Sequence, residues 1–410
     1  MKDYILLNAP EEIKYAQIIN AIKKLKMKNE KFSVFKFLNR KPLFYKKIDL
    51  QRMPTTYKLI KDEIHLPPVI HIIGTNGKGS TGRFLAHTLL KRGYSVGHYT
   101  SPHILKFNER IWINGKNISD EKLEKVHKKL QTLMPTEVSE SLSYFEYTTL
   151  LAALAFERLD YVIMEAGLGG EFDATNVFDK KISLITTIDY DHQAFLGNTI
   201  EEIATTKLNS IDKEAIIGKQ IHPEIENVKW KMENEGKKIY NYLKFFKKEE
   251  IENLKKEFKF APFLFDNYLL AMSLLKKENI PFSIKDIEDL TLPGRMQEIE
   301  KDLWIDVGHN PLAARAIVNT LPKKVNLVYN TYSDKDYKEI LNILKPKINK
   351  LYLIKVDNER MEKPEKIKKT AESLGIEVEE FKEIKKPMLV FGSFSVVEEF
   401  LRRYGAGESI

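Results

Sequence analysis

The sequence predicts an α/β protein of two domains, a large one with a mostly parallel sheet and a smaller, Rossmann-like one at the C-terminus. Three observations lead to this prediction. The chain has 410 residues, more than one hydrophobic core usually serves. From residue 69 onward, short β-rich runs alternate with longer helical stretches, which is typical of a parallel sheet covered by helices. The alternation is interrupted by Leu-Pro-Gly-Arg at 292–295 and then starts again.

The expected elements of the larger domain follow the spacing of its apolar residues. Within residues 11–29, isoleucines and an alanine recur at helical spacing, which predicts an amphipathic helix. Val-Ile-His-Ile-Ile at 69–73 predicts a strand, because the run is short and rich in β-branched residues. The other expected elements are a helix over 81–91 that Gly93 ends, strands over 95–99, 161–164 and 183–187, and helices over 147–158 and 265–277.

The same alternation returns after the break at 292–295. It predicts a strand over 303–306, a helix from Pro311, strands near 325–329 and 350–354, and a strand over 388–391 that leads into a helix. We therefore place a boundary near residue 294, with a first domain over 1–293 and a second over 294–410. A cleft between two α/β domains is a common place for a site that takes two substrates.

Composition excludes several classes of protein. The chain has no cysteine, so disulfide scaffolds, thiol nucleophiles and cysteine-ligated zinc are excluded. No apolar run approaches the roughly 20 residues that span a bilayer. The apolar stretch at residues 4–7 is too short for the core of a signal peptide. We therefore expect a cytoplasmic protein with no membrane partner.

The net charge of +8 is concentrated near the N-terminus. Residues 1–60 hold 14 Lys/Arg against 5 Asp/Glu, and the rest of the chain is nearly balanced. Lysines outnumber arginines 55 to 11, whereas proteins that read guanine edges depend on arginine. A lysine-rich solvated surface is the first interpretation, and attraction of an anionic substrate is the second. We expect no nucleic-acid partner.

A glycine-rich loop, Gly-Thr-Asn-Gly-Lys-Gly-Ser at 74–80, joins the first predicted strand to a helix. Glycines let backbone N–H groups approach phosphate oxygens, and Lys78 adds a positive charge. Ser80 or Thr81 offers a hydroxyl near a metal ion. The spacing departs from the common G-x-x-x-x-G-K-[ST] pattern, since a glycine also follows the lysine. A turn that only caps the helix is the alternative, but the strand–loop–helix context predicts nucleotide binding and a P-loop domain.

Two further features stand where ligands bind in such folds. Glu165 follows the strand over 161–164, at the carboxyl end where open α/β sheets place their ligands. A solvent-facing glutamate at a strand end is the alternative. Ser-Tyr-Phe-Glu at 143–146 offers aromatic rings on which a heterocycle could stack, or it is an ordinary apolar helix start.

Five motifs occur in order along the chain. They are GTNGKGS (74–80), TSPHILKFNERIWING (100–115), MEAGLGGEFDATNVF (164–178), IDYDHQAFLGNTIEEIATTK (188–207) and LPGRMQ (292–297). Together they closely resemble the folylpolyglutamate synthase and dihydrofolate synthase family, which belongs to the Mur ligase superfamily. The resemblance runs from about residue 48 to the C-terminus, with weaker late matches at 333–336 and 392–393.

The resemblance implies an ATP- and Mg²⁺-dependent ligase and assigns its site residues. It implies ATP contacts at Asn76, Gly77, Lys78, Gly79, Ser80, Asn267, Arg295 and Asp306, and metal ligands at Ser101, Glu165 and His192. Catalytic roles fall on Lys78, Lys207 and His309, the last near the incoming glutamate. Taken alone, Lys207 reads as a helix-surface lysine and His192 as a packed or exposed histidine. In the family, the lysine that matches Lys207 is carbamylated to N6-carboxylysine.

Contacts to the pterin-bearing substrate are also implied by the resemblance. They fall on Ser143, Tyr144, Phe145, Glu146 and Phe172, with Asp49 as a further candidate. The sequence departs from the family pattern at three places, of which the first and the third bear on substrate preference and not on the reaction type. Glu171 replaces the family's usual arginine, Val-Gly replaces Gly-Ala before His309, and the segment 48–53 lacks the family's glycine.

The resemblance therefore predicts a ligase that adds L-glutamate to dihydropteroate and to reduced folates through an acyl phosphate. A folylpolyglutamate synthase without the first activity is one alternative. A cell-wall ligase for UDP-linked peptides is another, although only 73 residues precede the loop, too few for a sugar-nucleotide domain. A nucleotide-binding protein without ligase activity is the third, and Glu171 is its best support. We expect small-molecule partners and a monomer.

Overall fold

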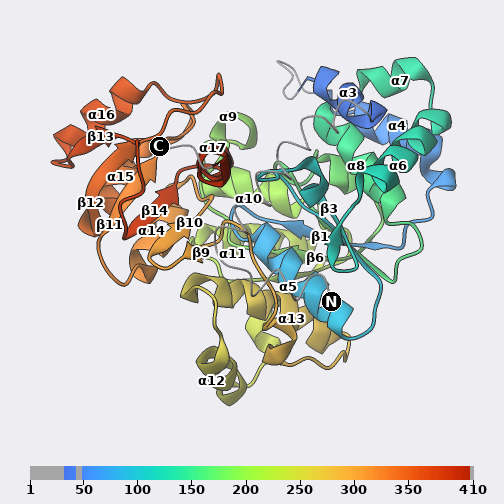
Figure 1. Cartoon of the computed structure of the whole chain (residues 1–410). Helices are drawn as coiled ribbons and strands as arrows, with labels where there is room; N and C mark the ends of the chain where they lie inside the picture. Colours follow the sequence, from blue (N-terminus) through green and yellow to red (C-terminus); the bar gives the residue numbers. More distant parts are fainter. Residues whose placement is uncertain (1–31, 43–48, 407–410) are drawn as a thin grey trace, which may run out of the picture. The chain divides into compact units, whose positions relative to one another are not determined.

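The computed structural model describes residues 32–42 and 49–406, so the helix expected over 11–29 lies outside the described residues. The chain divides into two compact units (Figure 1). One is Phe37–Leu292, and the other contains the chain from Pro293 onward together with the described residues 32–36. The division falls beside the expected Pro-Gly break, while the domain extents 1–293 and 294–410 stay predictions. Within the described residues, no helix is long and apolar enough to cross a membrane.

The first unit is built on a sheet in the order β4-β3-β2-β5-β1-β6-β7-β8. Strands β2, β5, β1, β6, β7 and β8 run parallel, while β3 pairs antiparallel with β2 and β4 pairs antiparallel with β3. All five residues of β1 are buried, as expected for a central strand covered on both faces. The strands are β1 (Val69–Ile73), β2 (Val96–Tyr99), β3 (Ile111–Ile113), β4 (Lys116–Asn117), β5 (Tyr161–Glu165), β6 (Lys180–Ile185), β7 (Glu214–Ile217) and β8 (Lys238–Asn241).

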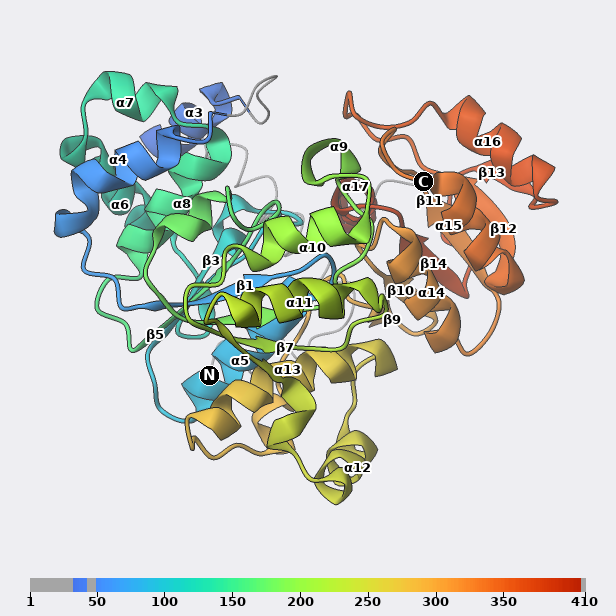
Figure 2. The ribbon, with the colours of Figure 1, turned by 180° about the vertical axis from the view of Figure 1, so that it is seen from behind.

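Helices cover both faces of this sheet (Figures 1 and 2). On one face, α5 (Lys78–Lys91) and α13 (Phe265–Lys277) share a hydrophobic core with β1, β5, β6 and β7. On the other face, α10 (Ile200–Leu208) and α11 (Glu224–Asn234) form a separate core with the ends of β1 and β6. The remaining helices are α3 (Ser33–Arg40), α4 (Arg52–Ile60), α6 (Asp120–Leu133), α7 (Thr136–Ser141), α8 (Tyr144–Ala155), α9 (Gln193–Leu196) and α12 (Lys248–Glu257).

The second unit has its own sheet, in the order β13-β12-β11-β14-β10-β9. All neighbours pair in parallel except β9, which is antiparallel to β10. Its core joins Trp304 and Leu389 of the sheet to helices α14, α15 and α16. The elements are β9 (Gln297–Glu300), β10 (Leu303–Ile305), α14 (Pro311–Thr320), β11 (Val325–Tyr329), α15 (Tyr337–Leu344), β12 (Ile348–Leu353), α16 (Pro364–Ser373), β13 (Val378–Glu380), β14 (Met388–Phe391) and α17 (Phe394–Ala406).

The predicted fold class is confirmed, with two helix positions corrected. Helix α5 begins at Lys78, not at residue 81, because Gly77 adopts a left-handed conformation (φ 91°) and lets the helix start inside the glycine-rich loop. Helix α8 spans Tyr144–Ala155 instead of 147–158. Ser143 caps its N-terminus earlier than the apolar pattern indicated, and Arg158 has left the helix with φ 62°.

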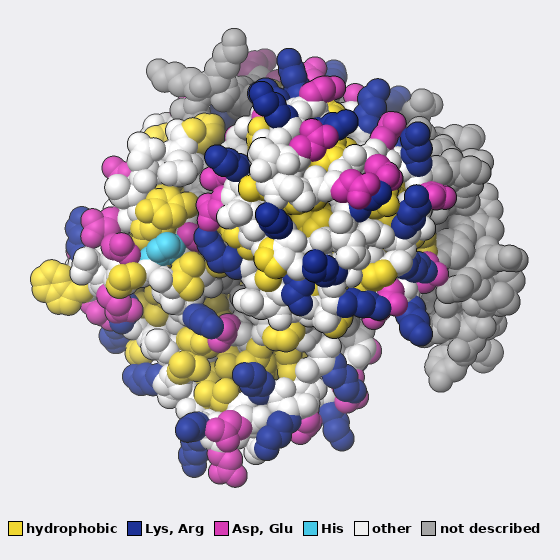
Figure 3. Space-filling view, turned by 90° about the vertical axis from the view of Figure 1, so that its left-hand side faces the viewer, with side chains coloured by type: hydrophobic (Ala, Val, Ile, Leu, Met, Phe, Trp, Pro, Cys, Tyr) yellow, Lys and Arg dark blue, Asp and Glu magenta, His cyan; other side chains and the backbone are white. Residues whose placement is uncertain are grey.

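The surface shows mixed charge in the part of the chain that the structure describes. On the face drawn in Figure 3, Lys and Arg side chains are interspersed with Asp and Glu. Many of the basic groups pair with acidic neighbours, as Lys350 does with Glu377 and Glu379. This pattern is typical of a solvated surface. The basic segment 1–60 is described only in part.

The packing of α13 predicts a large stability difference between two apolar truncations. Leu274 is 1% exposed in the core of the first unit, whereas Trp230 on α11 is 67% exposed. We expect Leu274→Ala to lower the free energy of unfolding by about 2–5 kcal/mol. We expect Trp230→Ala to change it by less than about 0.5 kcal/mol. Urea denaturation of both variants tests this, and equal losses would contradict the assigned packing.

Candidate active site

The glycine-rich loop lies at the carboxyl end of β1 and runs directly into α5. The Lys78 ammonium bends back and donates to the carbonyls of Gly74 (2.9 Å) and Thr75 (3.2 Å). The hydroxyls of Ser80 and Thr81 are buried and have no hydrogen-bond partner within residues 32–42 and 49–406. A buried hydroxyl without a partner is costly unless a ligand satisfies it. At the N-terminus of a helix, the ligand that fits is an anion such as a phosphate, with or without a metal ion.

Two glycines let the loop approach its neighbours closely. A Cβ on Gly74 (φ 142°) would lie 2.0 Å from the Thr186 hydroxyl at the end of β6. A Cβ on Gly77 would lie 2.4 Å from the Asn267 side-chain oxygen on α13. The sequence-predicted nucleotide contact Asn267 is thus brought to the loop. Asn76 continues the same turn, and its amide donates to the Thr187 carbonyl (3.3 Å).

Glu165 and Ser101 lie at the carboxyl ends of neighbouring parallel strands, on the side of the sheet where the loop also lies. Glu165 is the last residue of β5 and pairs in register with Ile72 of β1, while Ser101 lies two residues beyond the end of β2. The Glu165 side chain is only 2% exposed, and its Oε1 lies 2.5 Å from Nε2 of His98 on β2. His98 could not be predicted as a site residue from the sequence, because one histidine in a buried strand belongs to no motif.

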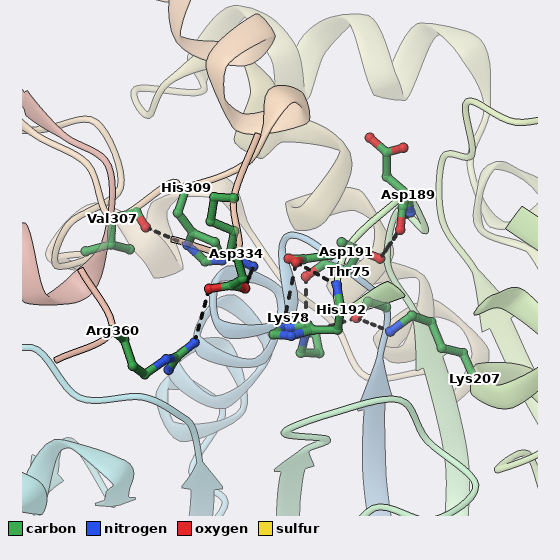
Figure 4. A network of polar contacts seen from close by, with 12 residues as sticks. Thr75, Lys78, Asp189, Asp191, His192, Lys207, Val307, His309, Asp334 and Arg360 are labelled. Carbon is green, nitrogen blue, oxygen red and sulfur yellow. Dashed lines mark hydrogen bonds and ion pairs between the residues drawn. The ribbon is translucent and has the colours of Figure 1, made fainter. Parts of the chain in front are cut away.

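Lys207 is the predicted residue whose environment differs most from expectation. It is buried on α10, not on the helix surface, and its Nζ donates to the Gly74 carbonyl (3.1 Å; Figure 4). Burial and the nearby Lys78 ammonium lower the pKa of Lys207 to about 7, against the opposing pull of Asp191 and Asp173. Two lysine side chains therefore share one carbonyl oxygen, an arrangement that favours a neutral amine at Lys207.

The Gly-Leu-Gly-Gly turn after Glu165 is held by Asp173, a residue that the sequence analysis missed. One Asp173 oxygen accepts from the amides of Gly167 and Leu168 (2.8 Å each), and the other accepts from the amide and hydroxyl of Thr175. Burial raises the pKa of Asp173, and these hydrogen bonds oppose the shift. The turn then packs on α10, where a Cβ on Gly170 would lie 2.7 Å from the Lys207 carbonyl oxygen.

Glu171, the departure from the family pattern, has a local partner. Its side chain accepts from the Asn209 amide (2.8 Å), and its backbone N–H donates to the Thr206 carbonyl (2.9 Å). The acidic side chain therefore attaches the Gly-Leu-Gly-Gly turn to the end of the helix that carries Lys207.

His192 lies in a polar cluster after β6 (Figure 4). It has a left-handed backbone (φ 52°), and its Nε2 lies 3.9 Å from Asp191 Oδ1. Thr75 of the loop exchanges two hydrogen bonds with the Asp189 backbone, and His222 contacts Asp189 Oδ1 at 2.7 Å. Asp189 thus ties the loop to the segment that carries His192, and the sequence analysis missed it as well.

The candidate pterin contacts divide into packed and exposed residues. Ser143 and Glu146 form a capping box at the start of α8, and Glu146 also pairs with Arg52 (2.8 Å). The Phe145 ring lies against Gly167, where a Cβ would come within 2.5 Å of it. Phe172 is 58% exposed, and Asp49 accepts from the Gln51 amide (3.0 Å). The Tyr144 ring lies 5.4 Å from the Arg110 guanidinium.

In the second unit, the structure brings Arg295 and Asp306 together. The buried Asp306 carboxylate accepts from the amides of Met296 (2.8 Å) and Gly308 (2.7 Å). Burial raises the pKa of Asp306, while the Arg295 charge and these amides oppose the shift. His309 follows in the same turn, with Nδ1 3.1 Å from the Val307 carbonyl. The Val-Gly departure fits this packing, since a Cβ at Gly308 would lie 2.7 Å from Phe391.

The described residues fit a magnesium site that depends on phosphates. Among them, no group of three or more His, Asp or Glu side chains is arranged to hold a metal ion. Mg²⁺ needs few protein ligands, because it keeps waters and binds phosphate oxygens with one or two carboxylates. The unpartnered Ser80 hydroxyl and the buried Glu165 carboxylate supply the oxygen ligands of such a site.

In the first unit, a phosphate-binding loop and a buried carboxylate lie at the carboxyl ends of parallel strands, and a second α/β unit follows along the chain. This is the arrangement of an ATP-dependent ligase of the Mur type. The Mur ligase, glutamate ligase domain family matches residues 294–388. The chain is 33% identical over 344 residues to the dihydrofolate synthase/folylpolyglutamate synthase of Haemophilus influenzae, covering 72% of this chain and 76% of the relative. The chain belongs to the dihydrofolate synthase/folylpolyglutamate synthase family.

Solved structures agree with this assignment. The Helicobacter pylori folylpolyglutamate synthetase is 36% identical, with a TM-score of 0.74 over 90% of this chain and 97% of that one. Escherichia coli FolC in complex with DHPP and ADP is 29% identical, with a TM-score of 0.78 over 90% and 96% of the two chains. The predicted family and enzyme class are confirmed.

The buried Lys207 predicts a pH dependence of stability. Its folded-state pKa of about 7 lies below the ordinary value of 10.5, so unfolding takes up a proton between these pH values. The contribution of Lys207 to stability is therefore least favourable below pH 7 and improves as the pH rises toward 10.5. We expect Lys207→Met to be more stable than the wild type at pH 7. Its free energy of unfolding should also rise less steeply with pH between 7 and 10.5. Urea denaturation in bicarbonate-free buffer measures both.

A matched control is Lys368→Met on α16, whose side chain is 54% exposed. This variant should keep the wild-type slope of stability against pH. If Lys207→Met also keeps that slope, the folded-state amine is not neutral near pH 7, and the assigned environment of Lys207 is wrong.

Proposed function

We propose that this chain catalyses the ATP-dependent addition of L-glutamate to dihydropteroate and to reduced folates. The observation that carries the proposal is the buried Lys207 amine, 3.1 Å from the Gly74 carbonyl of a loop with an unpartnered Ser80 hydroxyl. A phosphate loop alone would suit many nucleotide-binding proteins. A second, buried lysine with a lowered pKa beside the loop points to chemistry at the transferred phosphate.

The first unit supplies the phosphate site. The N-terminus of α5 and the Lys78 ammonium stabilise the charge on the β- and γ-phosphates of ATP, while Asn267 lies beside Gly77 as a further nucleotide contact. Because phosphoryl transfer needs mainly positioning and charge neutralisation, these groups carry most of its catalysis. Arg295 and Asp306 are the nucleotide contacts proposed in the second unit.

Ser80, Ser101, Glu165 and His192 are the residues that would hold Mg²⁺. When bound, the metal ion neutralises charge on the phosphates and orients them. Glu165 fits best, because its carboxylate is buried at the edge of the sheet that carries the loop. His192 is the least typical of the four, since imidazole is an unusual ligand for magnesium.

Lys207 is proposed to carry a carbamate. Only a neutral amine adds CO₂, and the low pKa of Lys207 supplies that form near neutral pH. The amine nitrogen bonds to the CO₂ carbon and one proton is released, so the product, N6-carboxylysine, carries a negative charge beside the positive Lys78. This change would add an attraction between the two side chains and provide a carboxylate that orients the reacting phosphate.

The reaction is proposed to run in two steps. The substrate carboxylate attacks the γ-phosphorus of ATP, giving an acyl phosphate and ADP. The amine of L-glutamate then attacks the acyl carbon, loses a proton, and releases inorganic phosphate as the amide forms. His309 in the second unit is the residue proposed near the incoming glutamate, and Tyr144, Phe145 and Phe172 offer aromatic surface to the pterin ring.

A narrower function, extension of folates without the dihydropteroate activity, is the second candidate. The observation that favours it is Glu171, an acidic residue where the family usually has arginine, bonded to Asn209 beside the Lys207 helix. Such a charge reversal near an anionic substrate changes which substrates are tolerated. The same assay with two substrates separates the two candidates. A monomeric state and a cytoplasmic location stay predictions.

We expect the purified protein, given Mg-ATP, L-glutamate and 7,8-dihydropteroate, to form a product heavier by one glutamyl unit. With a reduced folate monoglutamate, it should form longer chains. Mass spectrometry of the products checks both. Lys78→Met should lower the rate by about 100-fold or more, because a charge on the transferred phosphate is left unneutralised.

The control for Lys78→Met is Lys368→Met, which removes an exposed lysine on α16 of the second unit. This variant should leave the rate unchanged. Extension of folate alone would favour the narrower candidate and make Glu171→Arg the next variant. If neither substrate is extended by a protein that binds ATP, the ligase proposal fails.

A further inference from the structure

His98 is a buried histidine whose side chain forms, among the described residues, its only hydrogen bond with the proposed metal ligand Glu165. It is 0% exposed, and its Nε2 lies 2.5 Å from Glu165 Oε1. The two residues belong to neighbouring parallel strands, where His98 pairs with Ile163 and Glu165 follows two residues later. Both side chains therefore lie on the same face of the sheet. The other ring nitrogen, Nδ1, is buried and has no hydrogen-bond partner in the part of the chain that the structure describes.

The helix above this pair is shaped to admit the imidazole ring. A Cβ on Gly82 of α5 would lie 2.3 Å from His98 Nε2 and 3.0 Å from Cε1. Glycine is unfavourable inside a helix, and nothing in the backbone of α5 at this position requires it. Gly82 thus leaves room for the imidazole ring of His98, and a core built only of hydrocarbon side chains would not need this space. The close fit of Gly82 against the ring is an observation independent of the hydrogen bond.

Packing alone does not explain the imidazole. Valine or leucine would fill the space between β2 and α5 without burying two ring nitrogens, one of them unsatisfied. The hydrogen bond of the ring goes to one carboxylate oxygen of Glu165, a residue that is itself only 2% exposed. An N–H donated to Oε1 fixes the carboxylate plane and leaves the second oxygen to act as a ligand.

We propose that His98 is a positioning residue that holds the Glu165 carboxylate in the orientation needed to bind the magnesium ion of Mg-ATP, and that Gly82 makes room for it. The inference rests on the proposed function, since it assumes that Glu165 is a metal ligand. Partners that orient a metal ligand usually matter for affinity by about 10- to 100-fold.

The test measures binding of Mn²⁺, by electron paramagnetic resonance, to the full-length protein in the presence of a non-hydrolysable ATP analogue. His98→Val should weaken Mn²⁺ binding by about 10- to 100-fold. His98→Gln keeps an N–H donor and should recover most of the affinity. If Glu165→Gln is already present, His98→Val should add little, because the two residues act as one unit.

A matched control is His127 on α6, another buried histidine, whose Nδ1 lies 2.8 Å from the Tyr147 hydroxyl. His127→Val should lower thermal stability without changing Mn²⁺ affinity. If His98→Val behaves in the same way, with stability lost and Mn²⁺ affinity unchanged, His98 is only a core residue and the proposal is overturned.

If His98→Val does not fold, a substitution of Gly82 tests the same proposal. Gly82→Ala pushes a methyl group into the ring and should weaken Mn²⁺ binding, and an unchanged affinity in the folded variant would contradict the proposal. In the double variant with His98→Val, stability should recover relative to Gly82→Ala, while Mn²⁺ binding stays weak.

The two proposals fail in different ways. A wild-type protein that binds no Mn²⁺ with the ATP analogue and extends neither substrate refutes the proposed function. A wild-type protein that does both, beside a His98→Val variant with unchanged Mn²⁺ affinity, refutes only the role of His98.

Discussion

The close approach of the glycine-rich loop to its surroundings is the constraint on which the rest of the first unit depends. Gly74 lies where any side chain would collide with Thr186 after β6, and Gly77 lies where one would collide with Asn267 on α13. Without a Cβ at either position, a strand, a loop and two helices converge on one small volume. Helix α5 begins in this volume, and a helix N-terminus that follows a glycine-rich loop is the arrangement that binds phosphates.

Charge at the loop then sets the chemistry. Lys78 and Lys207 both donate to the Gly74 carbonyl, at 2.9 and 3.1 Å, so two ammonium groups would share one acceptor. Burial of Lys207 resolves this conflict by favouring its neutral amine. The amine is therefore neutral near pH 7 because of where α10 places it, and Gly170 and Asp173 hold the turn against which that helix packs.

Much of the fold could be predicted from the sequence, since α13 and β14 have the predicted bounds, 265–277 and 388–391. Motifs with fixed spacing also indicated the loop and Glu165. The misses share a physical reason. The start of α5 depends on a left-handed Gly77, and the contacts of His98 and Asp173 depend on which strands and turns become neighbours. No local pattern encodes such neighbours, so a lone histidine or aspartate carries no signal until the chain is folded.

The most direct test of the account is the fate of the substrate's carboxylate oxygen. Dihydropteroate labelled with ¹⁸O in its carboxylate would be incubated with the protein, Mg-ATP and L-glutamate. The ¹⁸O content of the released phosphate would then be measured by mass spectrometry. An acyl phosphate requires that one labelled oxygen leave with the phosphate, because the acyl carbon loses the oxygen through which it was activated. Phosphate without label, alongside normal amide formation, would contradict activation at the phosphate loop.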